Sequence, residues 1–99
     1  MDIKQDLQGK TLTLTLSGRL DAVTAGELEK VITSSLDGVT ELIFDLADLS
    51  YIASAGLRTL LVAQKRMKKQ GDMRLRNVQD EVREVLDMTG FIDFLQIEE

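Results

Sequence analysis

The sequence contains neither cysteine nor histidine. Without cysteine there is no disulfide, no thiolate nucleophile and no metal site built from Cys and His. Without histidine, the usual general base near neutral pH is missing as well. The commonest designs of hydrolases and metalloenzymes are therefore excluded, and we expect a protein that is not an enzyme and needs no cofactor.

Proline is absent too, and no Ser/Gly-rich tract or long block of like charge marks a linker. Because 99 residues is close to the commonest domain size, we expect one domain over residues 1–99. No apolar run approaches the ~20 residues that span a bilayer, and the first residues lack the apolar core of a signal peptide. These features predict a cytoplasmic protein.

Charge is mostly acidic, since 17 Asp and Glu against 12 Lys and Arg leave a formal net charge of −5. Phosphate backbones and anionic membranes repel such a chain, so neither nucleic acid nor a membrane is an expected partner. The acidic surface is either simply solvated or faces a basic surface on a protein partner. The basic cluster Lys65, Arg66, Lys68 and Lys69 lies at the expected end of a helix, where the helix dipole favours cations.

Hydrophobic periodicity predicts an α/β protein. Two alternating strands, at 1–7 and 11–17, are joined by a turn at Gln8-Gly9-Lys10. Further strands are expected around 42–46 and 72–76, and helices around 24–37, 54–70 and 82–89. The order β-β-α-β-α-β-α predicts one mixed sheet of four to five strands with helices packed on it.

Several local details are expected as well. Thr24 and Glu27 have the spacing of a capping box. The run 42–44 suits a strand that is covered on both faces, and 18–21 and 47–53 are expected as loops. Beyond Gly90, an apolar tail should dock on the core through Phe91, Ile92, Phe94, Leu95 and Ile97.

The informative stretch runs from the buried strand at Phe44 to the helix at Leu57. In open α/β sheets, sites gather outside the carboxyl ends of strands. Ser54 is expected there as a helix N-cap, and its small neighbours Ala53, Ala55 and Gly56 leave the hydroxyl accessible to a large partner. A phosphate on Ser54 would be tolerated at a helix N-terminus, but at an interface it would be bulky and strongly hydrated. The alternative is that Ser54 only caps a helix.

The pattern Asp45-Leu46-x-x-Leu49-x-Tyr51-Ile52-x-Ser54-x-Gly56-Leu57 resembles the signature of STAS domains, which are named for sulfate transporters and anti-sigma factor antagonists. Gly18-Arg19-Leu20-Asp21 resembles the loop before that family's first helix, which usually carries small and apolar residues where Ala25 and Leu28 stand. The segment from Asn77 to Phe91 resembles its C-terminal helix and the turn after it. The likeness covers nearly the whole chain.

The resemblance implies an anti-sigma factor antagonist of bacterial partner switching. In that family the unmodified domain binds an anti-sigma factor that is also a serine kinase, and this frees the sigma factor. The kinase uses ATP and magnesium to phosphorylate the serine matching Ser54, the antagonist is released, and a serine phosphatase resets it. The expected partner contacts are Asp21, Ala53, Ser54, Ala55, Gly56 and Arg58.

One departure from the family concerns the neighbours of Ser54. Many phosphorylated members carry an acid before the serine and a second serine after it, where this chain has Ala53 and Ala55. The missing acid bears on recognition by a kinase, and Ser54 becomes the sole hydroxyl between Ile52 and Leu57. A constitutive assembly subunit of STAS fold, in a lipid-transport or stressosome-like complex, is therefore the alternative function.

Two further interpretations are weighed against these. Asp45 and Asp48 form an acidic pair of the kind that binds Mg²⁺, although a strand-end residue bonding loop amides and a turn former are the simpler roles. A phosphate-handling enzyme or nucleotide-binding domain is disfavoured, because the chain has no glycine-rich phosphate loop, no P-loop lysine motif and no histidine.

Overall fold

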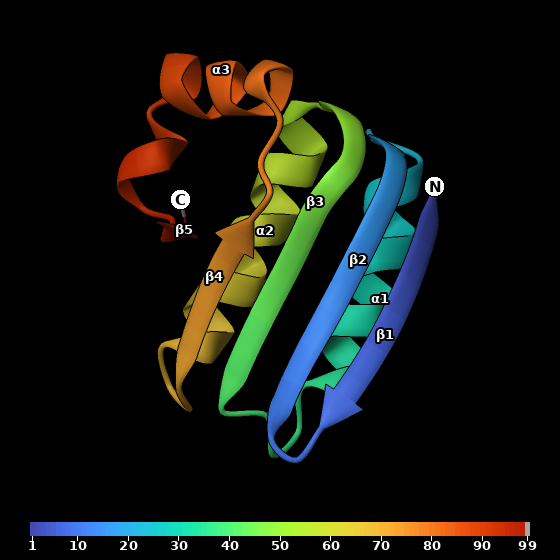
Figure 1. Ribbon diagram of the computed structural model, residues 1–99, viewed down its shortest axis with the longest axis vertical. Helices are drawn as coiled ribbons and strands as arrows, with labels where there is room; N and C mark the ends of the chain where they lie inside the picture. The colour runs from blue at the N-terminus through green and yellow to red at the C-terminus, as the bar shows by residue number, and fades with distance from the viewer. Residues whose placement is uncertain (99) are drawn as a thin grey trace.

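The computed structural model describes residues 1–98 as a five-stranded sheet with helices on one face (Figure 1). The spatial order is β1-β2-β3-β4-β5; β1 runs antiparallel to β2, and all other neighbours are parallel. The elements are β1 Asp2–Gln8, β2 Thr11–Leu20, α1 Thr24–Ser35, β3 Glu41–Ile52, α2 Ser54–Met67, β4 Asp72–Arg76, α3 Asp80–Thr89, the short 3₁₀ helix η1 Phe91–Asp93 and β5 Ile97–Glu98. The predicted α/β class and mixed sheet are confirmed.

The core lies between the sheet and helices α1 and α2. Leu12, Leu14 and Leu16 of β2 are fully buried toward the helices, while the alternating threonines face the other side. Phe44, with no exposed surface, is the largest of the fully buried side chains. Each such side chain stabilises the fold by about 1.5–3 kcal/mol relative to leaving it in water. The period-two pattern therefore fixes which face of the sheet is buried.

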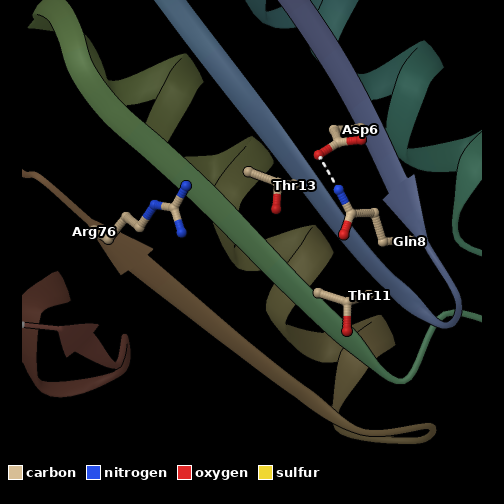
Figure 2. A pocket seen from close by; sticks show the side chains of 5 residues that line it. All are labelled: Asp6, Gln8, Thr11, Thr13 and Arg76. Atoms are coloured by element: carbon tan, nitrogen blue, oxygen red, sulfur yellow. Dashed lines mark hydrogen bonds between the residues drawn. The ribbon is translucent and has the colours of Figure 1, made fainter.

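Within residues 1–98, the other face of the sheet carries no helix (Figure 1), so the expectation that β3 is covered on both faces was wrong. Ile43 points to this face and is nevertheless only 7% exposed. Its register partners there are Thr13 and Arg74, so neighbouring sheet side chains surround it instead. Figure 2 shows the polar character of this face, where a hollow of about 380 Å³ is lined by Asp6, Gln8, Thr11, Thr13 and Arg76.

Most of the two segments predicted as loops, 18–21 and 47–53, is strand. β2 and β3 stay paired as far as Leu20 and Ile52, across two register shifts. The hydroxyl of Ser50 donates to the carbonyl of Gly18 at 2.9 Å and supports this pairing. Because bulges turn successive side chains to unexpected faces, Leu49 and Ile52 are buried at a spacing of three, which does not match the period of two expected for a strand.

The C-terminal segment docks only in part. Leu95 is buried, and Phe91, Ile92 and Ile97 pack partly buried against the core. Phe94, expected to dock with them, is 64% exposed. Within the described residues, no helix is long and apolar enough to cross a membrane.

Candidate functional site

Ser54 is the first residue of α2, and Ala53 alone separates it from the end of β3. The N-cap position belongs to Ala53, whose amide donates to the carbonyl of Leu20 at 2.9 Å and whose backbone is extended. The expectation that Ser54 is the N-cap was therefore wrong by one residue. Its hydroxyl makes no hydrogen bond within residues 1–98, and the residue is exposed. The serine thus presents an uncommitted hydroxyl beside the free amides of a helix N-terminus.

Gly56 explains how α2 comes so close to the strand ends. A Cβ at this position would lie 2.6 Å from Leu20 Cγ and 3.1 Å from Ile52 Cγ1, and both of those side chains are buried. Only glycine leaves room for this approach. Gly56 is itself buried, so it supports the Ser54 surface from beneath while Ala53 and Ala55 lie partly exposed beside the serine.

Asp21 caps α1. Its Oδ1 accepts from the amides of Val23 at 3.0 Å and Thr24 at 3.1 Å, and its own amide donates to Thr24 Oγ1 at 2.9 Å. The reciprocal pair is therefore Asp21 and Thr24, and the expected pairing of Thr24 with Glu27 was wrong. The amide of Thr24 is the main cause that lowers the pKa of the Asp21 carboxyl. An Asp-x-x-Thr spacing was the available signal in the sequence.

The predicted contacts converge on one end of the molecule. The bond from Ala53 to Leu20 holds the start of α2 beside the Asp21 turn, and the exposed Arg58 lies one turn after Ser54. A neighbouring groove of about 260 Å³ between α1 and α2 is lined by Ala22, Ala25, Gly26, Glu29, Ala55, Arg58, Thr59 and Val62. The side chains of this surface can receive a partner, since most of them are small.

Sequence reasoning missed several members of this surface. Val23 is 80% exposed and Val62 is 44% exposed, and both are apolar. Nearby, the guanidinium of Arg19 lies 4.2 Å from the centre of the Tyr51 ring. The signal for Val62 was its position off the buried stripe of α2. No sequence signal could pair Arg19 with Tyr51, because their contact depends on the shifted register of β2 and β3.

Asp45, within β3, ties this strand to the end of β4. Its Oδ1 accepts from the Ala47 amide and from Asn77 Nδ2, both at 3.1 Å, and its Oδ2 accepts from Arg76 at 3.3 Å. Burial alone would raise the pKa of Asp45, but the bonds from Asn77, Ala47 and Arg76 lower it on balance. Asp45 therefore bonds neighbouring backbone and side chains as expected, but it and Asp48 both lie within β3, so the expected strand-end and turn positions were wrong. Among residues 1–98, no three His, Cys, Asp or Glu side chains gather to hold a metal ion.

Asp45→Asn is expected to make stability less sensitive to acid. A carboxyl whose pKa is lowered by folding stabilises the native state above its unfolded pKa of about 3.9, and this contribution disappears as pH falls through the folded pKa. The variant removes that titration. Urea unfolding at pH 5 and pH 3 should show a smaller loss of unfolding free energy in the variant than in the wild type. Equal losses in the two proteins would contradict the assigned role.

The model of the STAS domain family matches residues 2–99, and the chain belongs to this family. The chain is 31% identical over 99 residues to BtrV of Bordetella bronchiseptica, a candidate anti-sigma factor antagonist, covering 98% of this chain and 85% of the relative. It is 30% identical over 102 residues to the anti-sigma-B factor antagonist of Staphylococcus aureus, covering 100% of this chain and 94% of that protein.

Solved structures share the fold. The phosphorylated form of the Bacillus cell fate determinant SpoIIAA superposes with a TM-score of 0.76 at 20% identity, over 99% of this chain and 92% of that one. At this identity the likeness bears on the fold alone. It agrees with the five-stranded sheet and the helices on one face described above.

Proposed function

We propose that this chain is an anti-sigma factor antagonist whose binding is switched by phosphorylation of Ser54. The observation that carries the proposal is the exposed, uncommitted hydroxyl of Ser54 at the first position of α2. The function of the Staphylococcus aureus relative supports the regulatory class, and the surface around Ser54 supports the mode of binding. The chain acts by binding and supplies no catalytic group.

In the unmodified state, the surface around Ser54 binds an anti-sigma factor that is a serine kinase. Asp21, Ala53, Ser54, Ala55 and Arg58 lie on this surface with Gly56 beneath them. The small side chains let the partner's backbone approach closely, and the groove between α1 and α2 accepts a side chain. The exposed valines Val23 and Val62 add apolar area. ATP and magnesium belong to the kinase.

Phosphorylation would release the partner without unfolding the antagonist. A phosphate adds roughly −1.5 to −2 charges at neutral pH. Within the chain, the free amides at the start of α2 and the nearby Arg58 offset that charge. In the complex the same group would lose its water and collide with the partner, so the bound state is disfavoured. A serine phosphatase restores the binding form.

The first test is the intact mass of the protein after incubation with a lysate of its host cells and MgATP. We expect the wild type to gain one phosphate and Ser54→Ala to gain none. Ser50→Ala is the matched control, because the Ser50 hydroxyl is already committed to the carbonyl of Gly18. It should gain a phosphate like the wild type. Phosphate on the Ser54→Ala protein would refute the assignment of the acceptor.

Ser54→Asp is expected to weaken binding to the kinase found in this way by about tenfold or more, since it places a charge in a desolvated interface. Its thermal midpoint should stay close to that of the wild type, because a carboxylate at the first turn of a helix is favourable. Calorimetric titration and thermal unfolding measure the two quantities. Unchanged affinity would contradict a switch at this position.

A constitutive assembly subunit of STAS fold is the second candidate, and Ala53 favours it by removing the acid that commonly precedes the phosphorylated serine. Under this alternative Ser54 only begins α2. No gain of phosphate by the wild type, in a lysate whose kinases modify a control substrate, would establish the alternative over the switch.

A further inference from the structure

A third hollow lies on the other side of α2 from the groove between α1 and α2, against the C-terminal segment. It measures about 200 Å³ and is lined by Leu61, Gln64, Lys65, Lys68, Phe91 and Phe94. The side chain of Gln64 donates to the carbonyl of Phe94 at 3.1 Å and holds the end of η1 against the helix. We call this hollow the Phe94 groove. It shares no lining residue with the groove between α1 and α2, so it is separate from the surface proposed above.

Within the described residues, no segment covers the Phe94 ring at the apolar part of the groove. Leu95 enters the core, and Phe94 beside it remains 64% exposed. Aromatic side chains contribute large contact areas, and the chain has only three phenylalanines. A phenylalanine left at the surface of a groove is therefore available to contact another molecule.

The rim of the groove is basic. All four ion pairs of the described chain use arginines: Arg66–Asp37, Arg74–Glu41, Arg74–Glu98 and Arg76–Asp45. Arg66 also donates to the carbonyls of Ile32 and Thr33 and so joins α2 to the end of α1. Lys65 and Lys68 form no ion pair within residues 1–98 and lie beside the phenylalanines. The basic cluster thus divides into the structural Arg66, the lysines Lys65 and Lys68 at an apolar groove, and Lys69 outside it.

We propose that the Phe94 groove binds a short acidic segment of a protein partner, which inserts one bulky apolar side chain between Leu61 and Phe94. The groove is smaller than the ~300–1,000 Å³ of usual small-molecule sites, which favours a single side chain as the occupant. Carboxylates on either side of that side chain meet Lys65 and Lys68. The net charge of −5 does not prevent this, because charges beyond about 8 Å are largely screened at physiological ionic strength.

An anionic membrane is the less favoured occupant. Stable attachment of a peripheral protein to a membrane generally takes two signals, and clusters of 4–8 basic residues are typical of lipid recognition. The groove offers two lysines and a single strongly exposed aromatic ring. Because the proposal does not depend on phosphorylation of Ser54, its test can fail or succeed independently of the proposed function.

The test selects short random peptides displayed on phage against the full chain, with counter-selection against a Lys65→Glu/Lys68→Glu variant. We expect the enriched peptides to carry Leu, Phe or Trp between acidic residues. Amide chemical shifts of the labelled protein should then change at the groove residues on addition of one synthetic peptide from the selection. Failure of any peptide to enrich, or shift changes located around Ser54, would overturn the proposal.

Variants locate the contact. Affinity for that peptide should fall about tenfold or more in Lys65→Glu/Lys68→Glu and in Phe94→Ala, and less in Lys69→Glu, which changes the same kind of charge outside the groove. Ser54→Asp should leave it unchanged. Vesicles of phosphatidylcholine and phosphatidylglycerol are the second probe. Binding to these vesicles that requires Lys65 and Lys68 would identify a membrane site and overturn the peptide proposal.

Discussion

Gly71→Ala is expected to lower the free energy of unfolding by ~3 kcal/mol or more, with a fall in the thermal midpoint of over ~12 °C. A Cβ at position 71 would overlap the carbonyl group and the Cα of Thr40. The amide of Asp72 donates to that same carbonyl at 3.0 Å, so the two segments are held together at the start of the β3–β4 pairing. Backbone cannot rotate away as a flexible side chain can, and the strands must separate.

Gly26→Ala is the matched control for this substitution. Gly26 lies within α1, and a Cβ there would have no atom within 4 Å. Because glycine disfavours the interior of a helix, the alanine should stabilise the chain by about 0.5–1 kcal/mol. Urea unfolding of both variants measures the contrast. A Gly71→Ala protein as stable as the wild type would show that the close approach to Thr40 is absent in solution.

Phe44→Ala is expected to cost about 3–5 kcal/mol of unfolding free energy. Phe44 is fully buried at the centre of the sheet, in register with Leu14 on one side and Leu75 on the other. Both neighbours are fully buried as well, so their strands cannot close the cavity without losing their own pairing. A protein of this size has a total stability of roughly 5–15 kcal/mol, and the variant will be at best marginally folded.

The comparison for Phe44 is Phe94→Ala, which removes the same side chain from a position that is 64% exposed. Its unfolding free energy should lie within about 0.5 kcal/mol of the wild type. Urea titration, followed by circular dichroism, measures both. A large loss in Phe94→Ala would mean that the ring packs into the fold in solution, and it would remove the basis of the Phe94 groove.

The two surfaces proposed for this chain share α2 but use different parts of it. Ser54 and Arg58 lie in its first turns, while Lys65 and Lys68 face η1 further along. A helix of this length can present separate contacts to a kinase and to an acidic segment. A competition experiment decides whether one partner contacts both surfaces. The selected peptide competes with that partner for binding to the Ser54→Asp protein, in which only the Ser54 surface is altered.

The order of the elements could be predicted because each depends on local patterns. The alternation of leucine and threonine in β2, the helical stripe through Leu28 and Ile32, and the left-handed Gly90 that ends α3 are visible within a few residues. The stretch around Ser54 is likewise local, and it carried the resemblance to the STAS family. The period of the apolar residues identifies the buried face of an element, because side chains return to the same face every two residues in a strand and every 3.6 residues in a helix.

What the sequence could not determine depends on segments that are distant along the chain. The bulged pairing of β2 with β3 turned two expected loops into strand, and the bond from Ala53 to Leu20 moved the helix cap by one residue. The Arg66 side chain donates a hydrogen bond to the carbonyl of Ile32 in α1, and the Phe94 side chain lies outside the core. Register, coverage of a face and access to a groove are decided only when remote segments meet, because their energies come from contacts that no local pattern contains.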